Sequence, residues 1–362
     1  MSQKFAFTTA AMSAALEETP VSYEDLADIE QEFDDVETEI IRQQIALSAP
    51  LYERRSKTVS QIPNFWPLVL EQAPPDIDQY IQPSDSALLL SSLLSISVSH
   101  FEAEANTPGG DPRSVSVTWE FAPNEYFLDE KLEKKFWYRR AKDGWCGLVS
   151  EPVEIQWKEG KDLTGGLLGL VCKAWEAEKK ASAASNAGPK TNGKAKKEGL
   201  TPEQKILKRK IENTGMGGLS FFAWFGFIGR KISEEESRDA TRIEKEKREK
   251  REKRKAAKSS SEAHESVDED VEEEQDQDGE DDEDTDMDLE IFPDGDDLAV
   301  SITEDLWPSA IKYFTQAQEQ DALSDADFES DDEEGGTGEG EGSAGESDAE
   351  NDDRPKKKQR SS

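Results

Sequence analysis

Acidic residues are concentrated towards the end of this 362-residue chain, and this uneven charge limits how much of the chain can form a core. The formal net charge is −37, of which residues 231–362 contribute −29 through 47 acidic and 18 basic side chains. Apolar residues make up 34% of the chain and cluster before residue 230. We therefore expect a folded part of roughly 200 residues and a charged part that buries too little apolar surface to offset its ordering entropy.

The densest acidic run, SVDEDVEEEQDQDGEDDEDTDMDLE at 266–290, has 16 acids and no base. The acids that define the run are Asp268, Glu269, Asp270, Glu272, Glu273, Glu274, Asp281, Asp282, Glu283 and Asp284. It follows a mostly basic segment, RIEKEKREKREKRKAAK at 242–258, in which Glu and Lys recur four residues apart. Such pairs favour a solvated charged helix or a spacer. A nuclear import signal and a nucleic-acid patch are the functional alternatives for this basic segment.

The sequence lacks the usual marks of an enzyme or of a metal or cofactor site. Cys146 and Cys172 have no metal-ligand spacing and suit a reducing compartment. The only histidines, His100 and His264, suggest no Ser-His-Asp or Cys-His pairing, and GMGG at 215–218 is better explained as a linker than as a nucleotide loop. No apolar run approaches a membrane span. We expect a non-enzymatic protein with no cofactor, no metal and no membrane partner.

The segment that starts at Ser22 predicts a long helix with one narrow apolar seam. Asp25 stands three residues after Ser22, close to a capping box, and apolar residues then recur at alternating spacings of three and four, with Gln43 as the polar exception. Pro50 should kink or interrupt the helix. The helix could lie on its own domain, but so narrow a seam favours pairing with a second copy of the chain. The predicted dimerisation residues are Leu26, Ile29, Phe33, Val36, Ile40 and Leu47.

From residue 88 the periodicity changes from helical to strand-like. Leu94, Ile96 and Val98 alternate with serines, and apolar and polar residues alternate again over 115–121, with the turn-rich TPGGDP at 107–112 between them. Both stretches read as half-buried antiparallel strands.

Two further strands and two covering helices complete the expected α+β domain. LEKKFWYRR at 132–140 and PVEIQWK at 152–158 are the expected third and fourth strands, with the turn KDGWCG at 142–147 between them. A four-stranded antiparallel sheet with one polar face needs helices on its other face. The aromatic-rich segments 221–228 and 305–314 are the candidates for these helices.

Five segments together resemble the nucleosome assembly protein family, and within it the SET-like branch of histone chaperones. In order along the chain they read RRSKTVSQIPNFW, VTWEFAPNEYF, VEIQWKEGKDLT, LSFFAWFGF and EDLWPSAIKYF. The resemblance covers residues 22–164, 219–228 and 300–315. It implies a long dimerisation helix, an earmuff-shaped α/β domain and an acidic tail.

The resemblance also implies a function: an ATP-independent histone chaperone that shields core histones and promotes nucleosome assembly or disassembly. The expected partners are core histones, as the tetramer-forming pair, the dimer-forming pair or both, and a second copy of the chain. Strong direct binding to duplex DNA is not expected, because binding DNA requires net cationic contacts. In the family, histones engage the underside of the earmuff. The matching positions here are Glu125, Asp129, Lys161, Asp162, Thr164, Glu304 and Asp305.

The segment boundaries follow from these assignments. The expected parts are a flexible N-terminus at 1–21, a dimerisation helix at 22–60, an earmuff domain at 61–228 with a flexible basic linker at 165–218, a charged insertion at 229–299, a C-terminal helix at 300–316 and a disordered acidic tail at 317–362. The linker and the insertion are longer than the SET-like pattern would have them.

A compact basic cluster, RPKKKQR, stands near the end of the acidic tail. It predicts a nuclear localisation signal that an import receptor would bind, and hence a nuclear protein that could also shuttle to the cytoplasm. Its basic residues are Arg354, Lys356, Lys357, Lys358 and Arg360. Two other functional classes stay open at this point: an acidic nuclear adaptor or inhibitor of a non-histone basic protein or enzyme, and an enzyme whose site lies within the earmuff.

Overall fold

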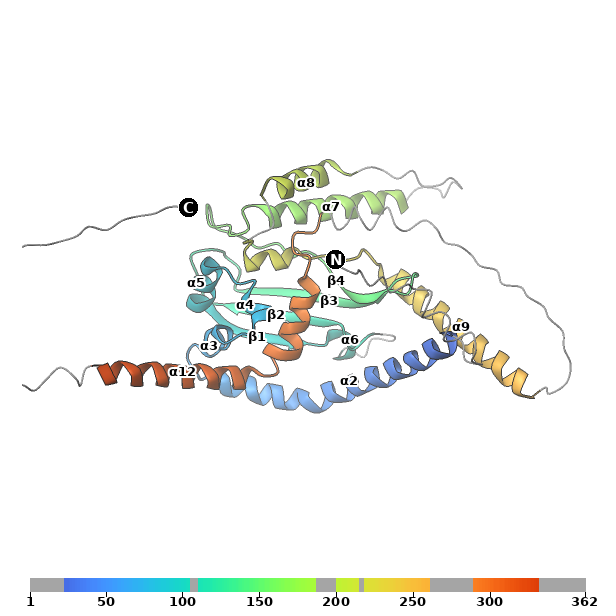
Figure 1. Ribbon diagram of the computed structural model, residues 1–362. Helices are drawn as coiled ribbons and strands as arrows, with labels where there is room; N and C mark the ends of the chain where they lie inside the picture. The colour runs from blue at the N-terminus through green and yellow to red at the C-terminus, as the bar shows by residue number, and fades with distance from the viewer. Residues whose placement is uncertain (1–22, 105–109, 187–199, 215–217, 261–288, 332–362) are drawn as a thin grey trace, which may run out of the picture. The chain divides into compact units, whose positions relative to one another are not determined.

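The structure is a computed structural model that describes residues 23–104, 110–186, 200–214, 218–260 and 289–331 (Figure 1). The chain divides into two compact units, residues 1–317 and 318–362, and all contacts discussed below lie in the first. The predicted capping residue Ser22, the residues that define the acidic run and the basic cluster at 354–360 lie outside the described residues.

Helix α2 (Tyr23–Val59) is 37 residues long and continues through Pro50. Pro50 therefore does not interrupt the helix. The missing N–H of Pro50 leaves a carbonyl one turn earlier without its helical partner. Both Pro50 and Ala46 are exposed, so that water can solvate this carbonyl.

Four antiparallel strands form one sheet in the order β1-β2-β3-β4, which confirms the expected α+β fold with a long N-terminal helix. The strands are β1 (Leu93–Ser99), β2 (Val115–Phe121), β3 (Lys131–Arg140) and β4 (Cys146–Ser150). The prediction of a fourth strand at 152–158 is wrong.

The fourth strand begins six residues earlier than expected because the turn after β3 is shorter than predicted. Ala141 N–H donates to the Trp145 carbonyl, Asp143 accepts from Trp145 N–H, and Gly144 adopts a positive φ of 92°. The chain therefore reverses within residues 141–145. The segment expected as the strand is paired in β fashion at an isolated bridge, from Trp157 to Phe127, and not along a ladder.

Leu94 points away from the core, contrary to its predicted place beside Ile96 and Val98. The pairing register shifts between Leu93, which pairs with Phe121, and Ser95. This irregularity turns Leu93 inward and leaves Leu94 61% exposed.

Short helices cover the sheet around an aromatic core. They are α3 (Phe65–Glu71), α4 (Pro75–Asp78), α5 (Pro83–Ser92), α6 (Phe101–Glu104), α11 (Gly295–Val300) and the start of α12 (Ala310–Asp331). The segment expected as a helix at 221–228 is instead the 3₁₀ helix η1 (Phe221–Gly226), and the next expected helix starts as a π-helical turn, η2 (Ser301–Leu306). Every residue of η1 is buried, and Phe221 and Trp224 pack against Trp119 with ring centroids 5.2 and 6.4 Å apart.

The described residues of the predicted flexible linker at 165–218 are largely helical, so that this prediction is wrong for them. Helices α7 (Leu167–Asn186) and α8 (Pro202–Thr214) lie side by side (Figure 1). They are ordered because they bury apolar side chains: Leu168 and Val171 of α7 and Leu207 of α8 are almost inaccessible to solvent.

The charged insertion contains helix α9 (Glu234–Ser260), in agreement with the helical alternative for its basic segment. Its first turns pack on the sheet domain, which the sequence did not predict. Ser237 and Ala240 are buried, and Arg140 N–H at the end of β3 donates to Ser237 Oγ over 3.0 Å. The C-terminal helix also departs from expectation, because α12 continues to Asp331 rather than ending near 316.

A fully buried lysine connects the sheet to η1. The Lys134 ammonium of β3 donates to the carbonyls of Glu151, Phe225 and Phe227 over 2.7, 3.1 and 2.6 Å. Burial lowers the pKa of Lys134 to about 7, while the nearby carboxylate of Glu290 acts in the opposite direction.

This lowered pKa makes stability depend on pH. Between about pH 7 and 10 the unfolded chain keeps the Lys134 proton that the folded chain releases, so that stability should rise with pH. We expect the free energy of unfolding of the wild type, relative to Lys134→Met, to increase by up to about 1.4 kcal/mol per pH unit in this range. Denaturant titrations followed by tryptophan fluorescence measure it. The exposed neighbour Lys135 supplies the control Lys135→Met. A difference between wild type and Lys134→Met that stays constant with pH would contradict the assignment.

Candidate functional site

The predicted seam of α2 is exposed along its whole length. Its six residues are between 44% and 75% exposed. Leu51, one turn beyond Leu47, is 62% exposed and lengthens the seam. So long a contiguous apolar stripe is unusual on the surface of a soluble monomer and marks an interaction face.

Polar contacts hold α2 on the sheet domain. Arg113 donates to Asp34 over 2.6 Å and lies over the ring of Tyr138. Towards the other end of the helix, Arg55 lies over the ring of Trp307 at 4.4 Å and donates to its carbonyl over 2.5 Å. These contacts fix α2 on the domain and leave the seam free.

The loop between β2 and β3 and the segment between β4 and α7 bring five of the seven predicted histone-binding residues together. They are Glu125, Asp129, Lys161, Asp162 and Thr164. The bridge from Phe127 to Trp157 joins the loops, and the side chain of Asp129 accepts from Gln156 N–H over 2.7 Å. Lys161 lies 3.7 Å from Glu125, whose side chain is 85% exposed. The exposed carboxylate of Glu125 can therefore meet a basic partner.

Asp162 and Thr164 also support the start of α7. Asp162 accepts from the backbone N–H of Thr164 and of Gly166 over 2.8 and 3.0 Å, and Thr164 Oγ1 accepts from Leu168 N–H. Thr164 is 2% exposed, so that a partner could not contact it directly without a rearrangement.

The other two predicted residues, Glu304 and Asp305, lie on η2. Glu304 is exposed, whereas Asp305 accepts from the Tyr313 hydroxyl over 2.8 Å. Burial and this hydrogen bond raise the pKa of Tyr313 to about 12.

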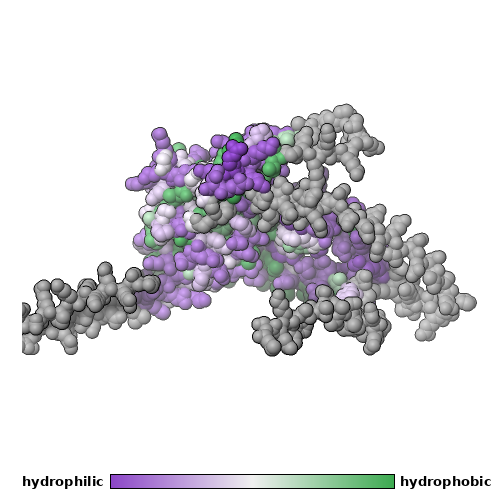
Figure 2. Space-filling model, turned by 45° about the horizontal axis from the view of Figure 1, so that its top comes forward, coloured by the Kyte–Doolittle hydropathy of each residue, from purple (hydrophilic) through white to green (hydrophobic). Residues whose placement is uncertain are grey.

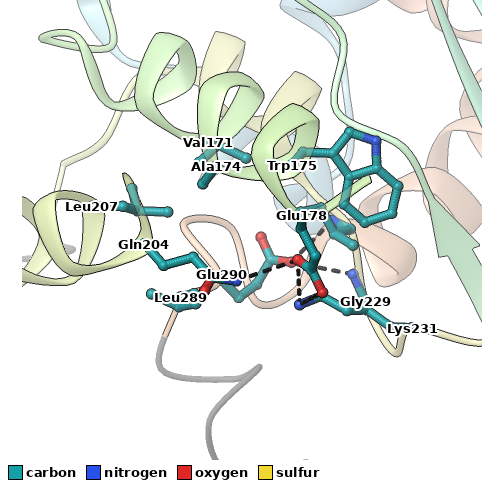
Figure 3. Close-up of a pocket in the computed structure, with 11 residues that line it drawn as sticks. Val171, Ala174, Trp175, Glu178, Gln204, Leu207, Gly229, Lys231, Leu289 and Glu290 are labelled. Carbon is teal, nitrogen blue, oxygen red and sulfur yellow. Dashed lines mark hydrogen bonds and ion pairs between the residues drawn. The ribbon is translucent and has the colours of Figure 1, made fainter. Parts of the chain in front are cut away.

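A pocket between α7 and α8 includes a buried carboxylate that sequence reasoning missed (Figure 3). Glu290 is 8% exposed and accepts from the backbone N–H of Ile228, Gly229 and Phe292. Burial raises its pKa, and the hydrogen bonds and Lys134 act in the opposite direction. In the sequence Glu290 looks like the last acid of the run; the apolar residues around it, in LEIF, were the available signal that it belongs to the core.

The described part of the chain offers neither a metal-binding cluster nor a membrane-spanning helix. No group of three or more His, Cys, Asp or Glu side chains there is arranged to hold a metal ion. Nor is any described helix long and apolar enough to span a membrane.

The family model described as nucleosome assembly protein matches residues 27–317, which include most of α2, the sheet, α9 and the first turns of α12. The chain belongs to the nucleosome assembly protein (NAP) family. This assignment confirms the resemblance seen in the sequence.

Two relatives of this NAP-family chain match shorter stretches. A Schizosaccharomyces pombe protein named as a nucleosome assembly protein is 40% identical over 157 residues, which cover 40% of this chain and 61% of that protein. Protein SET of Drosophila melanogaster is 32% identical over 127 residues, 34% of this chain and 43% of its own length. The crystal structure of Vps75 is similar over 82% of this chain and 98% of that one, at 22% identity and a TM-score of 0.46.

The hydrogen bonds of Asp162 give a prediction about the NAP domain. Asp162→Ala should lower the free energy of unfolding by about 1 kcal/mol, because it leaves two backbone donors near the start of α7 without an acceptor. Asp162→Ser should recover part of the loss. Glu159→Ala, in the same loop and exposed, is the matched control and should change stability by less than about 0.5 kcal/mol. Equal effects of the two alanine variants in denaturant titrations would show that Asp162 does not support α7.

Proposed function

We propose that this chain is a homodimeric histone chaperone that shields core histones and promotes nucleosome assembly or disassembly without ATP. The observation that carries the proposal is the NAP family match over residues 27–317 on a chain of net charge −37. A strongly acidic chain attracts a strongly basic partner, which would otherwise bind DNA non-specifically. Release of histones onto a forming nucleosome then follows from competing equilibria and needs no nucleotide hydrolysis.

The proposal divides histone binding between two kinds of acidic groups. Within the acidic run, residues 266–288 carry 15 acids in 23 residues, and fully extended they span at most about 80 Å. Such a polyanion raises the encounter rate with a basic protein. The exposed carboxylates of Glu125 and Glu304 supply short-range contacts, supported by Asp129, Lys161, Asp162, Thr164 and Asp305.

The dimer is proposed to form through the seam of α2. Residues 23–41 of the helix contain nine acids and no base, whereas residues 42–59 carry a net charge of +3. A parallel pair would place the two acidic halves against each other. An antiparallel pair places each acidic half beside a basic half, so that charge favours this arrangement.

The same proposal places the protein in the nucleus, with shuttling to the cytoplasm as a secondary feature. The basic cluster from Arg354 to Arg360 would bind the import receptor.

The seam can be tested by substitution. Replacing Ile29, Phe33 and Val36 together with Asp should convert the dimer to a monomer, because six carboxylates would be buried in each dimer at a high desolvation cost. Sedimentation velocity measures the mass. Leu128 is 65% exposed and lies outside the seam, so that Leu128→Asp is the control that should remain dimeric. A triple variant that sediments as a dimer would exclude the seam as the interface.

Histone binding across a salt series separates the two kinds of acidic groups. The first variant lacks the flanking acidic segments 266–288 and 332–353. These bounds leave Glu290, which is part of the core, and α12, which continues to Asp331, intact. The deletion variant should bind core histones more slowly than wild type at 0.1 M salt. Its association rate should approach that of the wild type near 1 M salt, because the range of charge attraction falls from about 10 to about 3 Å.

The comparison variant Glu125→Gln/Glu304→Gln should instead bind less tightly at both salt concentrations. Loss of all binding on deletion at every salt concentration would contradict a contribution from the folded surface. A wild-type chain that binds a non-histone basic protein and no core histone would overturn the proposed function.

A further inference from the structure

Helix α9 binds an acidic stripe on α2 that is separate from the seam. The stripe consists of Asp28, Glu32 and Asp35, which lie one helical turn apart. Arg251 pairs with Asp28 over 2.7 Å. Arg248 pairs with Asp35 over 2.8 Å and lies 3.8 Å from Glu32. At about 100° per residue, the stripe lies roughly 100° around the helix from the seam, so that α9 flanks the seam and does not cover it.

The pair between Arg251 and Asp28 is the strongest of these contacts. The Asp28 side chain is 10% exposed and that of Arg251 30% exposed, and Arg251 donates to the carboxylate through both Nε and Nη2. Removing one partner of so buried an ion pair leaves a charge without compensation. Arg248 and Asp35 are 24% and 61% exposed, which predicts a smaller contribution.

The other end of α9 packs on the sheet, so that the helix connects β3 with α2. Ala240 is buried, and Ser237 accepts from Arg140 N–H at the end of β3. The side chain of the same Arg140 donates to Gln31 of α2 over 3.1 Å. Figure 1 shows α9 leaving the sheet and meeting α2 near its N-terminal end.

The N-terminal half of α2 needs such support. Its nine acids repel one another, and acids of the stripe stand at i,i+4 spacing, where like charges destabilise a helix. Two of the six predicted seam residues, Ile29 and Phe33, lie between Asp28 and Asp35, the stretch that α9 contacts. If this stretch leaves the sheet domain, the seam is no longer presented as one continuous face.

We propose that α9 is a brace that positions the N-terminal half of α2 for dimerisation, with Arg248 and Arg251 as the positioning residues. This inference rests on the proposed dimer through the seam. When α9 detaches, only a fraction of molecules presents the complete seam. Because both chains of a dimer must present it, the apparent association constant falls by the square of that fraction. The insertion that carries α9 therefore contributes to assembly as well as to charge.

The test is the dimer dissociation constant of the full-length chain, measured by sedimentation over a dilution series. Arg248→Glu/Arg251→Glu should weaken the dimer by about tenfold or more. The matched control is Arg238→Glu/Arg242→Glu, which makes the same charge change on the same helix, at residues whose ion pairs are with Glu234, Asp239 and Glu246 of α9 itself. The control should weaken the dimer by less than about threefold.

A charge exchange shows whether any loss comes from the α9–α2 contact or from a failure to fold. Asp28→Arg alone should weaken the dimer, and adding Arg251→Asp should recover most of the affinity. Two outcomes with a dimeric wild type would overturn the brace and leave the seam intact. In one, Arg248→Glu/Arg251→Glu does not change the dimer affinity. In the other, the control variant changes it as much. A monomeric wild type would overturn the proposed dimer itself, and the brace with it.

Discussion

The buried ammonium of Lys134 and the buried carboxylate of Glu290 lie on either side of one short backbone segment, residues 225–229. Lys134 donates to the carbonyls of Phe225 and Phe227, and Glu290 accepts from the N–H groups of Ile228 and Gly229. Unpaired, either charge would be very costly in this core. With both present, the segment after η1 is held between β3 and the chain that returns from the acidic run.

The rest of the molecule depends on this segment because it fixes where the charged insertion starts and ends. Residues 229–233 lead from it into α9, whose arginines meet α2, and Glu290 holds the point at which the chain rejoins the core. The insertion is therefore attached at both ends to one folded domain. Under the proposed function, the domain would supply fixed positions, α2 the assembly face and the acidic groups the attraction for a basic partner.

The sequence was informative wherever one physical signal decided the outcome. The 3-and-4 spacing from Leu26 to Leu47 identified α2, and alternation identified β2 and most of β1. The sequence was misleading where local backbone geometry or contacts with distant residues determined the structure. The positive φ of Gly144 shortened a turn and moved β4, and a register shift exposed Leu94. Composition suggested a flexible linker where buried leucines form α7 and α8, and made Glu290 look like an ordinary acid of the run. The ion pairs between α9 and α2 join residues more than 200 positions apart, which no local pattern reveals.

The most direct test of the account is a competition between this protein and DNA for histones. Full-length protein is mixed at 0.15 M salt with non-specific duplex DNA and, in separate samples, with the tetramer-forming or the dimer-forming histone pair, and each mixture is analysed by sedimentation. The account predicts that at least one histone pair leaves the DNA and sediments with a dimer of this chain, without added ATP. Histones that remain on the DNA in both samples, at protein concentrations well above those of the histones, would contradict it.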